Sequence, residues 1–220
     1  MPRIEEEIKQ DVVDQLAWDD RVNVAPIDVE VRDSTVTLRG SVPNYQAKLA
    51  AIEDTEMMPG VDRVEDQLAV RWPPVYTPSD DDLWDDVDRA LRWNPNIDVT
   101  RIYIDVMDGV VSLEGTVESL WKKLHAEEVA ADVAGVAEVQ NRLAVVPTRS
   151  VDDEAIATDI VDSLKRNTLV DPEQVDVRVA NGIVTLEGSV PNWLVRRTVR
   201  DIAVRTAGVV DVRDKLTIPV

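Results

Sequence analysis

Apolar residues recur along this chain with two different spacings. From Ile8 to Leu16 an apolar residue stands at every fourth position, which places these side chains on one face of a helix. From Ile27 to Val31 apolar and polar residues alternate, as in a strand with one buried face. The pattern therefore predicts an amphipathic helix followed by a half-buried strand.

The same succession of patterns occurs three times. The segment V-x-L-x-G-x-V begins at Val36, Val111 and Val184, so the copies are offset by 111 − 36 = 75 and 184 − 111 = 73 residues. A period this long indicates a domain, because stacked repeats have periods of about 20 to 50 residues. The corresponding helical triplets are Ile8/Val12/Leu16, Leu83/Val87/Leu91 and Ile156/Ile160/Leu164. The alternating runs are Ile27/Val29/Val31, Ile102/Ile104/Val106 and Val175/Val177/Val179.

Three tandem domains of roughly 70 residues follow from this repeat. We expect them to span residues 1–71, 76–146 and 149–220. The proline-rich segment 71–78 predicts a stiff first linker, and segment 147–150 is too short to let its neighbours separate widely.

Turn and cap residues complete the pattern within each copy. Asp108-Gly109 and Asn181-Gly182 tolerate the positive φ of a tight hairpin, and Asp33-Ser34 is a weaker equivalent. A polar residue that can cap a second helix follows the second strand of each copy, namely Asn44, Ser119 and Asn192. We expect that helix to end at the repeated glycine of its copy, Gly60, Gly135 or Gly208. The last short strand should run parallel to the preceding strand, but its neighbour in the sheet stays open.

A second set of glycines, Gly40, Gly115 and Gly188, stands at the end of the second strand in each copy. We expect a structural role, in which glycine permits a bulge or a close approach of two backbone segments. Contact with a ligand is the alternative.

The chain is strongly acidic and contains no cysteine. Its 43 acidic and 24 basic residues give a net charge of −19, which opposes binding to nucleic acid. The absence of cysteine excludes disulfides and thiolate zinc sites. The first residues lack the apolar segment of a secretory signal, and no stretch has the length of a membrane span. We therefore expect a protein that is not integral to a membrane and is cytoplasmic, or periplasmic if an export signal has been removed.

Charge differs among the copies. The first two have nets of −8 (16 acidic, 8 basic) and −9 (15 and 6), whereas the third has −2 (12 and 10). These counts cover residues 1–71, 72–147 and 148–220. The basic residues of the third copy concentrate on its second predicted helix, where Arg196, Arg197 and Arg200 share a face one turn after Trp193.

Three interpretations of this basic helix remain open. An anionic phospholipid surface or an acidic protein partner would select Trp193, Arg196, Arg197 and Arg200. Alternatively, these residues form a solvated outer face, with Val195, Val199 and Ile202 turned to the core. A third hypothesis is internal, because the acidic first and second copies can pair with this helix until an anionic surface competes.

The remaining acidic and aromatic residues suggest structural roles. Segment 79–88 holds six aspartates, which suit the positive end of a helix dipole, and a weak site for a divalent ion or potassium is the alternative. Trp18 and Trp93 occupy equivalent positions, and we expect both in the core. Trp72, Trp84 and Trp121 have no counterparts, which suits contacts between domains or exposed faces.

Signatures of catalysis are missing from the sequence. His125 is the single histidine, and the chain shows no phosphate-binding glycine loop, metal-ligand pair or serine nucleophile motif. We expect a non-catalytic protein without a cofactor or a bound metal.

The ordered set of a glycine-containing hairpin, V-x-L-x-G-x-V, a following helix and a closing Gly-Val resembles the BON domain, named for bacterial osmotically induced and nodulation proteins. The resemblance covers nearly the whole chain. It implies an α+β fold of three tandem αββαβ sandwiches, each a three-stranded sheet with two helices on one face. It also implies a role in osmotic or envelope stress with binding to phospholipid. The alternative is a cytoplasmic protein that responds to potassium or a similar ion, or acts as a scaffold.

Overall fold

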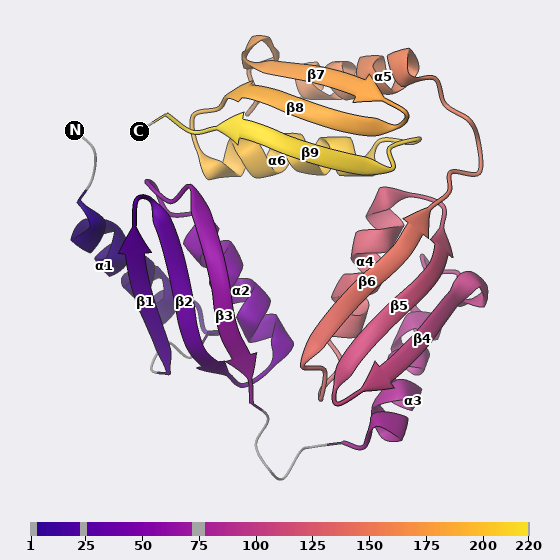
Figure 1. Ribbon diagram of the computed structural model, residues 1–220. Helices are drawn as coiled ribbons and strands as arrows, with labels where there is room; N and C mark the ends of the chain where they lie inside the picture. Colours follow the sequence, from indigo (N-terminus) through magenta and orange to yellow (C-terminus); the bar gives the residue numbers. More distant parts are fainter. Residues whose placement is uncertain (1–3, 23–25, 72–77, 220) are drawn as a thin grey trace.

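The computed structural model describes residues 4–22, 26–71 and 78–219, which form three units of one architecture (Figure 1). Unit 1 contains α1 (Glu5–Trp18), β1 (Ile27–Arg32), β2 (Thr35–Val42), α2 (Tyr45–Glu56) and β3 (Arg63–Val70). Unit 2 contains α3 (Asp80–Trp93), η2 (Val99–Arg101), β4 (Ile102–Met107), β5 (Val110–Val117), α4 (Leu120–Ala131) and β6 (Glu138–Val145). Unit 3 contains α5 (Asp153–Arg166), η3 (Pro172–Gln174), β7 (Val175–Ala180), β8 (Ile183–Ser189), α6 (Trp193–Arg205) and β9 (Asp211–Thr217). Trp72 and most of the expected stiff linker lie outside the described residues.

Each unit is a three-stranded sheet with its two helices on one face. In unit 1 the order is β1-β2-β3, where β2 runs antiparallel to β1 and parallel to β3. Units 2 and 3 repeat this topology. The predicted direction of the last strand is confirmed, and its neighbour, which the sequence left open, is the central strand. The α+β architecture expected from the resemblance is thereby confirmed.

The hairpins form at the predicted turns. Asp33, Asp108 and Asn181 have φ values of 47°, 52° and 54°. In units 2 and 3 the first helix also holds its hairpin, because Asp80 Oδ2 accepts from the backbone N–H of Asp108 (2.9 Å) and Asp153 Oδ2 from that of Asn181 (2.7 Å). Part of the acidic stretch 79–88 therefore has an internal role.

The predicted helix faces form the core of each unit. Val12, Val87 and Ile160 are fully buried, each on the first helix of its unit. The expectation that Trp18 and Trp93 pack in the core is wrong, because they are 85% and 83% exposed. Each is the last residue of its helix. In α1, Trp18 lies two residues beyond the buried Leu16. Its side chain therefore points about 200° around the helix from the apolar face.

Both sets of repeated glycines adopt positive φ. Gly40, with φ 128°, stands where a Cβ would collide with the carbonyl oxygen of Pro26. A Cβ on Gly115 would collide with the carbonyl oxygen of Arg101, and a Cβ on Gly188 with that of Gln174. The prediction that the second helix ends at Gly60, Gly135 or Gly208 is wrong, since α2, α4 and α6 end three or four residues earlier. These glycines lie in the following turn, where a Cβ on Gly208 would be 2.8 Å from Val151 Cβ, ahead of α5.

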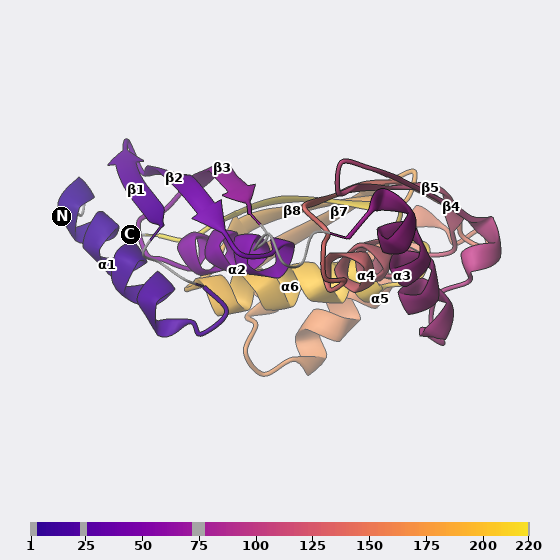
Figure 2. The same ribbon diagram turned by 90° about the horizontal axis from the view of Figure 1, so that it is seen from below.

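The units surround a common centre (Figure 1). Helices α2, α4 and α6 face this centre, and the three sheets lie on one side of the molecule with the helices on the other (Figure 2). None of the helices in the described parts of the chain has the length and apolar character that crossing a membrane requires.

Candidate binding site between the three units

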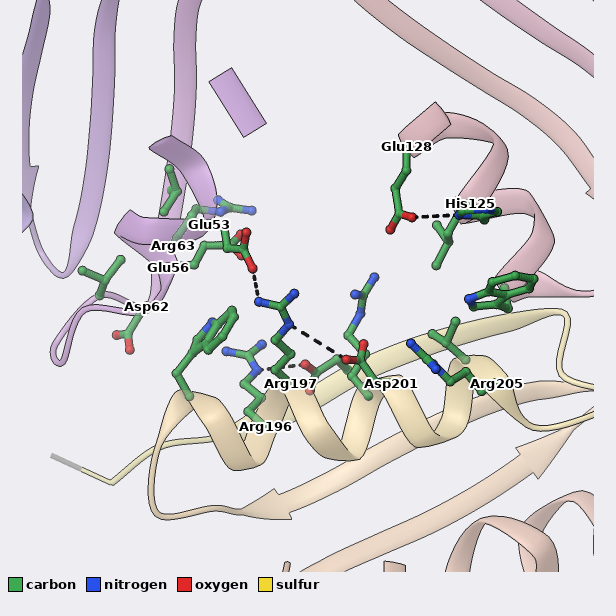
Figure 3. Close-up of a pocket in the computed structure, with 18 residues that line it drawn as sticks. Glu53, Glu56, Asp62, Arg63, His125, Glu128, Arg196, Arg197, Asp201 and Arg205 are labelled. Atoms are coloured by element: carbon green, nitrogen blue, oxygen red, sulfur yellow. Dashed lines mark hydrogen bonds and ion pairs between the residues drawn. The ribbon is translucent and has the colours of Figure 1, made fainter. Parts of the chain in front are cut away.

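A cavity of about 580 Å³ lies where the three units meet (Figure 3). Its walls come from α2 and the start of β3 in unit 1, from α4 in unit 2, and from α6 and β9 in unit 3. All four residues predicted for lipid or partner binding, Trp193, Arg196, Arg197 and Arg200, line it. The basic helix therefore faces the other two units.

The sequence of α6 explains this orientation. Asn192 caps the helix by accepting from the N–H of Val195 at 3.0 Å. Val195 and Val199 are buried in the core of unit 3, and Ile202 packs against it, as the interpretation with a solvated outer face required. The arginines line the cavity, where Arg197, Arg200 and Arg205 are also exposed to solvent.

Arg196 is bound within its own unit. Its Nε lies 2.8 Å from Asp214 Oδ2, and the Arg196 side chain is about one-third exposed. Unit 1 has the same arrangement at the equivalent positions, where Lys48 Nζ lies 2.8 Å from Asp66 Oδ2. This arginine therefore belongs to the common framework of the repeat.

Arg197 connects unit 3 to unit 1. Its guanidinium pairs with Glu53 of α2, lies 5.2 Å above the ring of Trp193, and is 3.9 Å from Asp201 (Figure 3). The pairing that the internal hypothesis expects is present for the first copy, since an acid of that copy pairs with the basic helix, while competition by an anionic surface stays a prediction. For the second copy, no ion pair joins a described residue to α6.

Three other arginines lining the cavity lack such a partner. Arg63 at the start of β3, and Arg200 and Arg205 on α6, form no ion pair with any residue in the described segments. All three are exposed. Arg63 and Arg205 were not among the predicted site residues. Arg63 offered a signal, because the equivalent positions of the other copies hold the acids Glu138 and Asp211.

The wall from α4 is aromatic. Trp121 stacks on His125 with ring centroids 4.8 Å apart and an interplanar angle of 13°. His125 Nε2 lies 2.9 Å from Asn94 Nδ2, and its Nδ1 lies 3.1 Å from Glu128 Oε2. Trp121 also packs against the core of unit 3, so one of the two alternatives for this residue, a contact between domains, applies.

Carboxylates accompany these arginines. Burial raises the pKa of Glu56, an effect that Arg196 and Arg200 oppose. Over residues 4–22, 26–71 and 78–219, no group of three or more His, Cys, Asp or Glu side chains is arranged to hold a metal ion. The cavity thus offers guanidinium groups, carboxylates and two tryptophan rings.

The first residue of the second helix behaves differently in each unit. Tyr45 of unit 1 is 7% exposed within the core of unit 2, and Leu120 of unit 2 is 6% exposed within the core of unit 3. Trp193, the equivalent in unit 3, lines the cavity between the units. The described core of unit 1 consists of unit 1 residues alone.

The chain is similar to a family of known domains and to a protein of Escherichia coli, and two solved structures align with it weakly. The model of the BON domain matches residues 4–71, 79–147 and 152–219. The chain is 30% identical over 136 residues to Osmotically-inducible protein Y of Escherichia coli (strain K12), in an alignment covering 59% of this chain and 68% of that protein. Solved structures of CdsD, a structural protein of the type III secretion system of Chlamydia trachomatis, are 15% identical with TM-scores of 0.27. They cover 97% and 99% of this chain and 92% and 100% of the CdsD chains, and such low scores support no structural argument.

Proposed function

The chain belongs to the BON domain family, and from that premise we propose that it is a non-catalytic binding protein of the osmotic-stress type that associates with anionic phospholipid through α6. Trp193, Arg196, Arg197 and Arg200 would form the contact. The relation to a protein named for osmotic induction supports the stress role.

The observation that carries the lipid proposal is the basic face of α6. Arg200 forms no ion pair with a described residue, and Arg197 is held by a single carboxylate of another unit, that of Glu53. An anionic headgroup that reaches the cavity can therefore bind Arg200 directly and compete with Glu53 for Arg197. Trp193 beside them offers the amphipathic ring typical of a membrane interface.

Co-sedimentation with vesicles tests this proposal. We expect the full chain to sediment with vesicles of phosphatidylglycerol and phosphatidylcholine but not with phosphatidylcholine alone, and high salt should weaken the binding. Reversing Arg197 and Arg200 to glutamate should abolish it. Arg196 is left in place because it pairs with Asp214 inside the unit.

The matched control reverses two arginines outside the cavity, Arg101→Glu and Arg166→Glu, which changes the net charge equally. If this control loses binding as completely as the α6 variant, net charge rather than α6 governs the association. Failure of the wild-type chain to sediment with anionic vesicles at low salt would end the lipid proposal.

A second candidate, an ion-responsive protein whose units change arrangement, rests on the contact between units 3 and 1. That contact relies on the Arg197–Glu53 ion pair, which salt screens, whereas Tyr45 and Leu120 are buried in the other two contacts. Small-angle scattering should show an increase in radius of gyration at high salt. Potassium and sodium at equal ionic strength would separate a specific ion from screening.

A further inference from the structure

We propose that the central cavity binds an anion carrying a phosphate group between unit 1 and unit 3, with Arg63, Arg200 and Arg205 as its contacts. This inference rests on the proposed binding role of α6 and extends it in two ways. It names the ligand chemistry, and it adds a residue from a different unit, Arg63, which only the assembled molecule brings to the site.

Comparison among the three copies supports the assignment. Of the five arginines that line the cavity, Arg196 alone has basic counterparts, Lys48 and Lys123. The other four stand where the remaining copies have apolar or acidic residues. These positions are Arg63 (Glu138, Asp211), Arg197 (Leu49, Leu124), Arg200 (Ile52, Glu127) and Arg205 (Met57, Asp132). The additional positive charge is thus specific to this junction.

The carboxylates of the cavity follow a different pattern. Glu53, Glu128 and Asp201 occupy one equivalent position of the repeat, so an acid there is common to all copies. Glu53 forms an ion pair with Arg197, and Asp214 forms one with Arg196. The carboxylates peculiar to this junction are those of Glu56 and Asp62, where the other copies have alanine or valine.

The balance of these groups indicates how an anion would be held. The lining contains six acidic residues and five arginines, so the cavity has no strong long-range attraction for anions. Recognition must come from direct contact with the three guanidinium groups that form no ion pair with a described residue. Guanidinium is suited to this task, because its planar set of donors matches phosphate oxygens in pairs.

The volume of the cavity limits the ligand. About 580 Å³ is within the range of ordinary small-molecule sites, which is about 300 to 1,000 Å³. A phospholipid headgroup or a small soluble phosphate fits such a volume. Trp121 and Trp193 at its walls provide apolar surface for the part of the ligand that carries the phosphate.

Isothermal titration calorimetry of the full chain with pyrophosphate, at constant ionic strength with chloride as the competing anion, tests the site. We expect saturable binding that the double variant Arg63→Gln/Arg205→Gln weakens about tenfold or more. Neither arginine has an ion pair with a described residue to lose, so the fold should persist, and circular dichroism checks this. The matched control, Arg101→Gln/Arg166→Gln, should bind as the wild type does.

Absence of pyrophosphate binding by the wild type, or equal weakening in the control, would overturn the site.

Vesicles of phosphatidylglycerol and soluble glycerol 3-phosphate then separate the two sources of phosphate. Where the wild type binds pyrophosphate, loss of vesicle binding in Arg63→Gln supports the site with a lipid headgroup as its ligand. Pyrophosphate binding that depends on Arg63, without vesicle binding, supports the site with a soluble phosphate and contradicts the lipid function. Vesicle binding that Arg63→Gln leaves unchanged, together with no pyrophosphate binding, contradicts the site and leaves the lipid function standing.

Discussion

The contact between units 1 and 2 and the contact between units 3 and 1 use equivalent positions with opposite chemistry. In the first, Tyr45 is buried in the core of unit 2 and Leu49 packs against it. In the second, Trp193 and Arg197 occupy those positions, and Arg197 pairs with Glu53. The same scaffold thus supports an apolar contact and a charged contact, and the first residues of the second helix decide between them.

This difference predicts unequal strength. Burial of apolar surface stabilises a contact by about 25 cal/mol per Å² and is insensitive to moderate salt. A partly exposed ion pair such as Arg197–Glu53 contributes about 0 to 1 kcal/mol and weakens as salt rises. We therefore expect the molecule to open first between units 3 and 1.

The largest effect should come from breaking an apolar contact. Tyr45→Ala removes a buried aromatic side chain and should lower the free energy of unfolding by about 3 kcal/mol, measured by urea denaturation. Scattering should also show separation of units 1 and 2. The control Tyr103→Ala removes a tyrosine that is 65% exposed on β4 and should change little. Equal losses in both variants would mean that Tyr45 does not hold the contact.

A second variant tests a buried acid that is present in unit 1 and has apolar counterparts in units 2 and 3. Asp54 of α2 is 2% exposed and its Oδ2 has no hydrogen-bond partner among the described residues, whereas the equivalent positions hold Val129 and Ile202. Burial, and then the charge of Asp19, raise the pKa of Asp54 from 3.8 to about 6. A shift of about two pKa units corresponds to about 3 kcal/mol.

Because the folded-state pKa is raised, the unfolded chain releases this proton first, and stability falls as pH rises from about 4 to about 6. Asp54→Val should make that slope shallower and stabilise the protein at pH values above 6 by about 2 kcal/mol, while the slope that Glu56 contributes remains. Asp19 behaves oppositely, since hydrogen bonding to Arg21 lowers its pKa to about 2, and its contribution is lost as pH falls through that value. Denaturation curves across this range would refute the assignment if the substitution left the slope between pH 4 and 6 unchanged.

Arg197→Leu should replace the charged contact between units 3 and 1 with an apolar contact like those that Leu49 and Leu124 make. At low salt the free energy of unfolding should change by less than about 1 kcal/mol. The dependence of the radius of gyration on salt should disappear, which small-angle scattering measures. An expansion at high salt equal to that of the wild type would show that Arg197 does not control the opening.

The smallest effect is expected for the exposed tryptophans. Trp18→Ser should alter the free energy of unfolding by no more than about 0.5 kcal/mol, because 85% of this side chain already contacts solvent. Leu16→Ala, two residues earlier in the core, provides the contrast and should cost about 3 kcal/mol. A large loss in Trp18→Ser would reveal a contact that the structure does not contain.

The fold of one unit could be predicted because the repeat presents each helix and strand in three related sequences. Strand alternation, hairpin dipeptides and the helix faces are local signals, and all of them were confirmed. The positions of Trp18 and Trp93 were wrong because hydrophobicity was given more weight than helical phase. The helix ends were misplaced because the glycines serve a turn that follows the helix.

The candidate site was only partly accessible from sequence. Arg196, Arg197 and Arg200 share one helix, so their proximity follows from spacing alone. Arg63 lies more than a hundred residues away, and its place in the cavity depends on how whole units pack. Comparing charge at equivalent positions would have singled it out, but without revealing what it faces.

The two ends of the described chain lie close together, beside the junction of units 1 and 3 (Figures 1 and 2). Along the chain, units 1 and 2 and units 2 and 3 are joined directly, which keeps each of these pairs at a high effective concentration. The charged contact instead joins units 3 and 1, which have the whole of unit 2 between them. Connectivity and side-chain chemistry favour opening at the same place. A circular permutant that joins the ends and cuts the chain between units 1 and 2 would separate these two influences, because the apolar contact would then lose its direct tether and the charged contact would gain one.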